Sequence, residues 1–349
     1  MDRGSEATST RDRKPKANLR KVAASCNLCG SIERAVVTTG REHEYENTTD
    51  DLFTVVRCTD CGLVYLDPRP DLSELPTIYP PNYYSYNQDT LRKNANPNSI
   101  LLKVRYAGFR AKIQKSLSLL QPSTEDKVAI LDIGCGDGHL LNLYREAIGD
   151  KADTHGVDFN LQAVAMASSQ GHKTYSGRFE DVELPDNYFD LVIASHVIEH
   201  VPDPKGFTEK VRRVLKAGGI FWFETPNIGS LDAKWFEKEH WGAYHFPRHW
   251  YFFSTQTIRQ LGERTAFKIE LIDYVPNAIF WFWTFHSMIV KAKPEWRKLA
   301  DALFPPVDFQ KDTFANFVRI CFFCTVDLAI KMVSGETSNM IVVFRKGEE

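Results

Sequence analysis

The stretch of sequence that decides the fold is Ile130-Leu-Asp-Ile-Gly134-Cys-Gly136-Asp-Gly138-His-Leu-Leu141. An apolar run typical of a buried strand ends here in three glycines spaced G-x-G-x-G, and a helical pattern follows at once. Glycine lets the backbone turn sharply and lets a ligand come close, because no Cβ is in the way. Since ligands of open parallel sheets bind outside the carboxyl ends of the strands, we expect a binding loop at these glycines.

Strand and helix patterns alternate along the chain on the C-terminal side of this stretch. Alternation of this kind predicts an α/β fold, a mostly parallel sheet with helices on both faces. The helix that begins near residue 206 is expected to stop at Gly218 and Gly219. We predict strands over 128–133, 154–159, 172–177, 189–195, 219–225, 268–275 and 340–346, and helices over 99–120, 139–148, 161–170, 206–219 and 255–265.

Acidic residues near the glycines indicate the charge of the ligand. Asp132 precedes the first glycine, Asp137 lies inside the loop, and Asp158 closes the second strand, where it could accept hydrogen bonds from both hydroxyls of a ribose. A nicotinamide enzyme would show G-x-G-x-x-G, and acids here would repel its pyrophosphate. They would favour a ligand that carries an ammonium and a sulfonium, so a nicotinamide oxidoreductase is the weaker alternative.

Four segments together resemble the class I S-adenosylmethionine-dependent methyltransferases over about residues 125–275: LDIGCGDG, GVDFN, FDLVIASHVIEHVPDP and RRVLKAGGIFWFETPN. The resemblance implies a doubly wound, mostly parallel seven-stranded sheet and S-adenosylmethionine as cofactor. Arg178 stands where many relatives carry an acid, so Glu180 or Asp181 is expected to meet the adenine, and Cys135 is expected to pack inside the loop. The cofactor residues implied are Asp132, Gly134, Cys135, Gly136, Gly138, Asp158, Phe159, Phe179, Glu180, Asp181, Ser195 and His196.

Two cysteine pairs near the N-terminus have the spacing of metal ligands. Each reads C-x-x-C-G, and the pairs are Cys26 with Cys29 and Cys58 with Cys61. Four thiolates suit a closed, structural Zn²⁺ site that has no open position for catalysis. A redox pair and four free thiols are the alternatives. Seven cysteines in all, an odd number, favour a reducing compartment and hence the cytoplasm.

The remaining sequence suggests how the chain is divided. We expect a disordered basic tail over 1–24, a zinc-ribbon module over 25–66, a Pro/Tyr-rich connector and helix over 67–122, and the methyltransferase domain over 123–349. The ribbon, the connector and the later segment PRHWYFFSTQTIRQL resemble methyltransferases of bacterial sugar and polysaccharide pathways. This resemblance implies a small-molecule acceptor, a sugar or other metabolite, with a nucleotide- or lipid-linked form as an open alternative.

Histidines are the best candidates for the base that removes a proton from a hydroxyl acceptor near neutral pH. His249 follows Pro-Arg in a loop after the fifth strand and is the first choice. His196, at the end of the fourth strand, and His245, in the same aromatic stretch as His249, are the other two. We expect His200 to have a structural role.

An apolar helical insertion is predicted near 276–333. Arg319 and Asp327 interrupt its second half, so we do not expect it to span a membrane. It is either a lid over the active site or a surface that makes peripheral membrane contact. The net charge of −2 argues against nucleic acid as a partner. RNA methylation through the ribbon and a non-catalytic ribbon scaffold remain alternatives, and the oligomeric state is left open.

Overall fold

A seven-stranded sheet forms the centre of the computed structural model, which describes residues 18–84, 100–120, 127–238, 240–307, 311 and 313–348. The strand order is β12-β13-β10-β9-β6-β7-β8, parallel from β10 to β8, with β13 antiparallel between β10 and β12. The predicted doubly wound, mostly parallel seven-stranded sheet is confirmed. The strands are β6 (Val128–Ile133), β7 (Ala152–Asp158), β8 (Lys173–Ser176), β9 (Phe189–Ser195), β10 (Leu215–Pro226), β12 (Phe267–Tyr274) and β13 (Asn339–Lys346).

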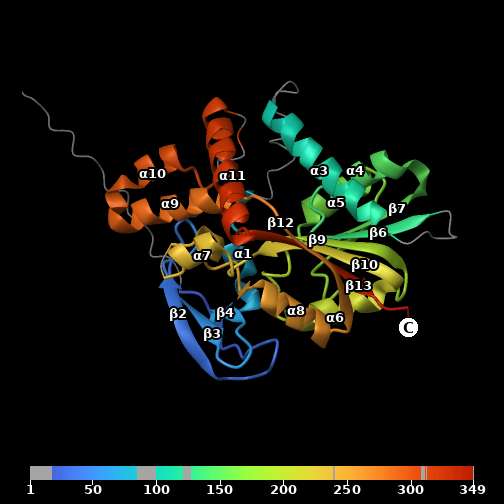
Figure 1. Cartoon of the computed structure of the whole chain (residues 1–349), viewed down its shortest axis with the longest axis horizontal. Helices are drawn as coiled ribbons and strands as arrows, with labels where there is room; N and C mark the ends of the chain where they lie inside the picture. The colour runs from blue at the N-terminus through green and yellow to red at the C-terminus, as the bar shows by residue number, and fades with distance from the viewer. Residues whose placement is uncertain are drawn as a thin grey trace, which may run out of the picture.

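Helices cover both faces of this sheet (Figure 1). One face carries α3 (Ile100–Ser118), α4 (His139–Ile148) and α5 (Leu161–Ser169). The other carries α6 (Pro204–Val214) and α8 (Thr255–Arg264). Side-chain caps begin these helices where the sequence supplies them, because the first amides of a helix have no partner within it. Asn160 caps α5 and Ser254 caps α8, the latter in a capping box.

The helix expected over 206–219 is shorter than its pattern predicts. It ends at Val214, and Leu215 already pairs with Phe189 on β9. The register of the β10–β9 pairing then shifts between Leu215 and Ile220, and Gly218 in that interval has a φ of 72°. The glycines therefore belong to an irregular strand start, since sheet pairing takes over before the helical pattern runs out.

The predicted ribbon segment does not build its sheet alone. Its four strands are β2 (Arg34–Gly40), β3 (Phe53–Cys58), β4 (Val64–Leu66) and β11 (Tyr251–Phe252), in the order β11-β4-β3-β2. The edge strand β11 comes from the later part of the chain, and the ribbon's buried residues belong to one hydrophobic core with those of the main sheet. Minor elements nearby are β1 (Lys21–Val22), β5 (Arg69–Pro70) and α1 (Leu75–Ile78).

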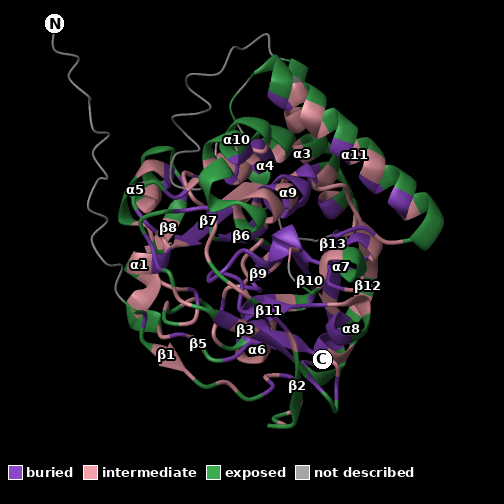
Figure 2. Cartoon of the chain, turned by 90° about the vertical axis from the view of Figure 1, so that its left-hand side faces the viewer, coloured by how far each residue is buried: buried purple, intermediate pink, exposed green. Residues whose placement is uncertain are grey.

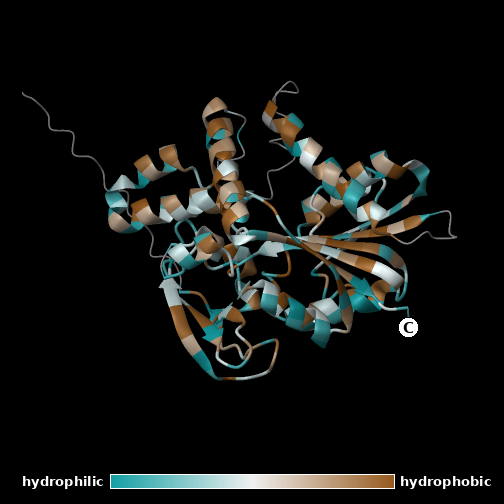
Figure 3. Ribbon diagram, viewed as in Figure 1, coloured by the Kyte–Doolittle hydropathy of each residue, from teal (hydrophilic) through white to brown (hydrophobic). Residues whose placement is uncertain are grey.

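The apolar insertion forms three helices, α9 (Ala278–Ala292), α10 (Arg297–Leu303) and α11 (Phe314–Ser334). Figure 2 shows the strands mostly buried and an exposed side along α11, and Figure 3 shows hydrophobic residues on both. α9 packs closely on a short turn at Gly242–Tyr244, where a Cβ on Gly242 would lie 2.0 Å from the Phe280 carbonyl oxygen. Within the described ranges, none of the helices combines the length and apolarity needed to cross a bilayer. The predicted tail lies outside the described residues as far as residue 17.

Candidate functional site

The glycine loop joins β6 to α4 at the carboxyl end of the sheet. Gly134, Gly136 and Gly138 all have positive φ values, of 78°, 53° and 82°. Only glycine adopts this region without strain, so the sequence builds the turn with three of them. The loop is tied to β7, because the amide of Gly134 donates to the carbonyl of Val157 at 2.8 Å. Cys135 is buried beneath it, against Gly156, as its packing role predicted.

Two carboxyl groups stand beside this loop. Asp132 is buried at the end of β6, and burial, followed by the charge of Asp158, raises the pKa of Asp132 to about 8. Asp158 ends β7 and accepts from the amides of Gly136 at 2.9 Å and Asn160 at 2.8 Å. Burial also raises the pKa of Asp158. A desolvated carboxyl without a cationic partner is a place where a positively charged ligand gains the most.

Phe159, next to Asp158, is 48% exposed, and its ring lies 5.9 Å from that of Tyr79. Tyr79 comes from the connector that follows the ribbon, and sequence reasoning did not select it. The two rings flank the edge of the loop, where an aromatic ligand could stack. The aromatic connector was the available signal, but nothing local in the sequence shows which tyrosine reaches this edge.

The three predicted residues of the loop that follows β8 lie in different surroundings. The ring of Phe179 is buried against Phe207, at 5.0 Å between centroids, which leaves its backbone as the part able to face a ligand. Asp181 is exposed and pairs with Arg178 at 2.9 Å. The Glu180 carbonyl accepts from Lys210 at 3.0 Å. The adenine contact of either acid therefore stays a prediction.

At the end of β9 an oriented histidine faces the same edge of the sheet. Ser195 is exposed, and His196 follows with a φ of 54°. His196 Nδ1 donates to Oε1 of the buried Glu199 at 3.0 Å, which leaves Nε2 with a lone pair. Burial disfavours the charged forms of both groups, but the hydrogen bond between them outweighs burial. It raises the pKa of His196 and lowers the pKa of Glu199 to about 2.

His249, the first-choice base, is almost fully buried beside this pair. Its Nδ1 donates to the carbonyl of Ala243 at 2.7 Å, and its Nε2 lies 4.0 Å from Glu199 Oε1. His200 lies against it, with ring centroids 4.6 Å apart. Burial lowers the pKa of both histidines, so both rings are neutral near pH 7.

His245 belongs to a neighbouring buried network. Its Nδ1 lies 2.6 Å from Glu44 Oε1, and its ring stacks on Trp283 at 4.5 Å. Burial lowers the pKa of His245 and raises the pKa of Glu44, so the protein interior disfavours charge on both groups. Among the described residues, the second oxygen of Glu44 is buried without a hydrogen-bond partner. Arg248 binds Glu42 and stacks over Tyr45 at 4.6 Å.

We call the buried network around His196, His245 and His249 the acceptor side. It contains residues that the sequence did not single out. Glu42 and Glu44 come from the segment between β2 and β3, and Tyr83 contacts His245 Nε2 at 3.4 Å. Lys112 of α3 donates to both carboxylate oxygens of Glu224 on β10 at 2.8 Å. These residues lie far apart in sequence and have no shared motif, so only the folded chain brings them together.

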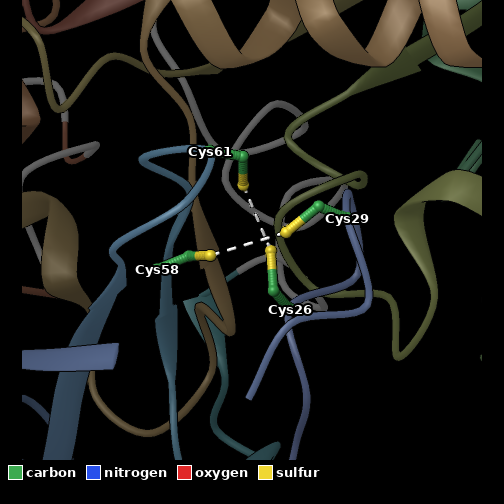
Figure 4. A group of neighbouring side chains, drawn as sticks. All are labelled: Cys26, Cys29, Cys58 and Cys61. Atoms are coloured by element: carbon green, nitrogen blue, oxygen red, sulfur yellow. Dashed lines mark hydrogen bonds between the residues drawn. The ribbon is translucent and has the colours of Figure 1, made fainter. Parts of the chain in front are cut away.

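The four predicted metal-binding cysteines converge (Figure 4). Sγ atoms lie 3.3 Å apart between Cys26 and Cys61 and 3.5 Å apart between Cys29 and Cys58, close to the roughly 3.8 Å of a tetrahedral site with Zn–S bonds of ~2.3 Å. Gly30 and Gly62 take φ values of 77° and 83°, and each donates its amide to the first cysteine's carbonyl. Burial raises the pKa of Cys58, but amides of Cys61 and Asp60 outweigh it and bring that pKa to about 7. The donor set therefore fits Zn²⁺.

Comparisons with known proteins agree with this fold. A family model described as a methyltransferase domain matches residues 106–272. A malonyl-[acyl-carrier protein] O-methyltransferase of Marinomonas sp. is 30% identical over 146 residues, 39% of this chain and 53% of that protein. A ubiquinone biosynthesis O-methyltransferase of Idiomarina loihiensis is 36% identical over 108 residues, 28% of this chain and 42% of that protein. The chain thus spans about half the length of these curated relatives.

Among solved structures, phosphoethanolamine N-methyltransferase 2 of Haemonchus contortus, in complex with S-adenosyl-L-methionine, is 16% identical. Its TM-score is 0.49, over 90% of this chain and 68% of that one.

Proposed function

We propose that this chain, whose residues 106–272 form a class I S-adenosylmethionine-dependent methyltransferase domain, transfers a methyl group to an oxygen of a small-molecule acceptor. The observation that carries the proposal is the oriented pair His196–Glu199, which follows β9 beside the glycine loop. S-adenosylmethionine supplies an electrophilic methyl carbon on a sulfonium. The chain must then bind this cofactor, orient the acceptor and take its proton.

The cofactor would lie across the glycine loop. The Gly136 amide holds the Asp158 carboxylate beside the loop, where it would accept from the ribose hydroxyls, and Phe159 with Tyr79 would enclose the adenine. The carboxyl of Asp132 would face the methionine end. Its high pKa without a ligand fits this role, because a nearby cation would favour the ionised form.

His196 is the base that the geometry favours among the three predicted histidines. Its side chain is 32% exposed, whereas those of His245 and His249 are at most 4% exposed. The carboxylate of Glu199 fixes its tautomer and stabilises the imidazolium that forms when Nε2 takes a proton. His245 and His249 would then position the groups around the acceptor.

A hydroxyl-rich acceptor such as a sugar suits the groups on this side. Glu44, Tyr83, His245 and Arg248 form a buried polar network, and one oxygen of Glu44 has no hydrogen-bond partner in the described part of the chain. The matched relatives have names that describe different acceptors, so we infer the class from this chain's own residues. A nucleotide- or lipid-linked sugar would present the same hydroxyls.

Calorimetry with S-adenosylmethionine tests the cofactor half of the proposal. We expect binding with 1:1 stoichiometry, and S-adenosylhomocysteine should compete. A non-catalytic scaffold would give no heat of binding. The acceptor half is tested by methyl transfer from labelled S-adenosylmethionine to a panel of nucleotide sugars, with RNA as the comparison. Cofactor binding with transfer only to RNA would overturn the sugar proposal.

We also propose that the four cysteines hold a structural Zn²⁺ and that the protein is cytoplasmic. The convergence of the four Sγ atoms supports the zinc, and a reducing compartment would keep the thiols free. With four sulfur ligands the ion would have no open position for chemistry. Its contribution would be to hold the knuckles that precede and follow the Glu42–Glu44 segment.

The outward side of α11 supports a peripheral membrane contact. Its exposed positions carry no charged side chain, and Phe314 and Met332 are each 82% exposed. Large uncharged apolar surfaces of this kind mark interaction sites. The exposed positions are Phe314, Ala315, Val318, Cys321, Phe322, Thr325, Leu328, Ala329, Met332, Val333 and Ser334.

Co-sedimentation with liposomes tests this contact. We expect binding that Phe322→Glu weakens, because a charge would enter the centre of the apolar side. Binding absent with both neutral and anionic lipid would contradict it.

A further inference from the structure

Three side chains on the acceptor side place metal-ligating atoms close together. Glu199, His200 and His249 each offer one ligand atom, and these three atoms lie within 4.8 Å of one another. Glu199 is completely buried, and His249 is 3% exposed. The first two residues follow β9, and the third lies in the segment before β11, so the fold and not a local motif brings them together.

Hydrogen bonds to backbone carbonyls orient the rings of both histidines. His249 Nδ1 lies 2.7 Å from the Ala243 oxygen, and His200 Nδ1 lies 3.0 Å from the Arg248 oxygen. A carbonyl oxygen only accepts, so His249 Nδ1 carries the hydrogen and the lone pair of that ring is on Nε2. His200 Nδ1 also lies 2.9 Å from the Tyr79 hydroxyl, which holds this ring from a second side. A carbonyl acceptor behind the ring is the usual way in which proteins orient a metal-binding histidine.

The carboxylate of Glu199 is the negative group of this cluster, and its geometry is fixed by its neighbours. His249 Nε2 lies 4.0 Å from Glu199 Oε1, too far for a hydrogen bond. Glu199 already accepts from His196 and from Thr225 Oγ1 at 3.2 Å, which orients the carboxylate. Two imidazoles and an oriented carboxylate whose ligand atoms lie this close together in the protein interior attract a cation strongly, because water screens them little.

We propose that Glu199, His200 and His249 bind a divalent transition-metal ion such as Zn²⁺, at a second site separate from the four cysteines. Two imidazoles and one carboxylate form a donor set that suits Zn²⁺ and Fe²⁺. Tetrahedral ligands at about 2.0–2.1 Å lie roughly 3.3 Å apart, so the groups would close by no more than about 1.5 Å.

Such a site would differ in kind from the cysteine site. Three protein ligands leave a position for an exogenous oxygen, whereas four thiolates leave none. If the proposed methyl transfer holds, that position would take the acceptor hydroxyl and lower its pKa before His196 removes the proton. Only this role rests on the proposed function, since binding of the ion needs neither cofactor nor acceptor.

The metal content of the wild-type protein is the primary test. After saturation with Zn²⁺ and gel filtration, we expect two ions per chain. A thiol-specific mercurial should release one of them, and a chelator should then remove the other. A single ion per chain, released entirely by the mercurial, would overturn the proposal whatever the variants do.

Substitution by Co²⁺ identifies the ligands of each ion. We expect a thiolate charge-transfer band from the cysteine site and weaker visible bands from the second site. His249→Asn and His200→Asn should lose the weaker bands and one ion per chain but keep the thiolate band, which also shows that the ribbon is folded. His245→Asn is the matched control, a buried histidine of the same segment that should retain two ions. Two ions in both ligand variants would refute the assignment.

Discussion

The cofactor side and the acceptor side of the sheet edge are built in different ways. Most of the cofactor side is local: Asp132 and the glycine loop come from one short stretch and Asp158 follows on the next strand, whereas Tyr79 comes from the connector. The acceptor side is assembled from distant segments, for Glu44 precedes β3 and its partner His245 precedes β11. The first relies on backbone conformation, whereas the second relies on a buried network of charged and aromatic side chains. A change in the ribbon should therefore affect the two sides unequally.

Cys58→Ser should produce the largest effect, and it tests this inequality directly. Loss of one thiolate should release the proposed ion, which in structural zinc sites contributes about 10–16 kcal/mol to folding. We expect acceptor turnover to disappear while the dissociation constant for S-adenosylmethionine changes by less than about threefold, measured by transfer assay and calorimetry. Cys321→Ser, which changes an exposed cysteine of α11, is the control. An equal loss on both sides would show that they form one cooperative unit.

His196→Asn should lower kcat by about 10²–10⁴-fold, the usual contribution of a positioned base. Cofactor affinity should stay within a factor of about two, since the change removes a proton acceptor and not a cofactor contact. Single-turnover transfer rates and calorimetry measure the two quantities. His286→Asn, a buried histidine of α9 that bonds to Asp301, should keep kcat. A full rate in the His196 variant would remove this residue from the chemistry.

Asp158→Ala should weaken S-adenosylmethionine binding by about 10- to 100-fold, because two hydrogen bonds from the ribose to a charged carboxylate would be lost. The metal content of the variant should be unchanged, which would show that the substitution affects cofactor binding alone. Asp186→Ala, an exposed carboxylate paired with Arg213, is the matched control and should bind normally. Unaltered affinity in the Asp158 variant would contradict the proposed ribose position.

Glu199→Gln should also shift the pH profile of kcat, measured on protein from which a chelator has removed the proposed second ion, since Glu199 is one of its proposed ligands. The carboxylate raises the pKa of His196, with a further contribution from Glu224 that Lys112 opposes. Because the base works when deprotonated, kcat falls as the pH drops through this raised pKa. Removal of the carboxylate lowers the pKa, so the acid limb should move to lower pH by about one unit or less. A shift toward higher pH would show that His196 does not define the limb.

The contrast also explains what could be predicted from the sequence. The alternating strand and helix patterns predicted the strands of the main sheet, and the G-x-G-x-G spacing predicted the loop. Both signals lie within a short stretch of sequence. The end of α6 was misplaced, since pairing of Leu215 with β9 overrides the helical pattern. Glu44, Tyr79 and Lys112 could not be selected, as each becomes significant only through a partner more than a hundred residues away or on another element.

The pairing of β4 with β11 has a consequence for how the chain is made. The cysteine knuckles leave the ribosome early, yet the strand that covers the edge of their sheet, Tyr251–Phe252, is synthesised only after most of the catalytic strands. Until then the nascent ribbon presents an open edge to other chains. Truncations that end before residue 252 should therefore aggregate even when metal is supplied, and the ribbon cannot be transplanted onto another protein without its late strand.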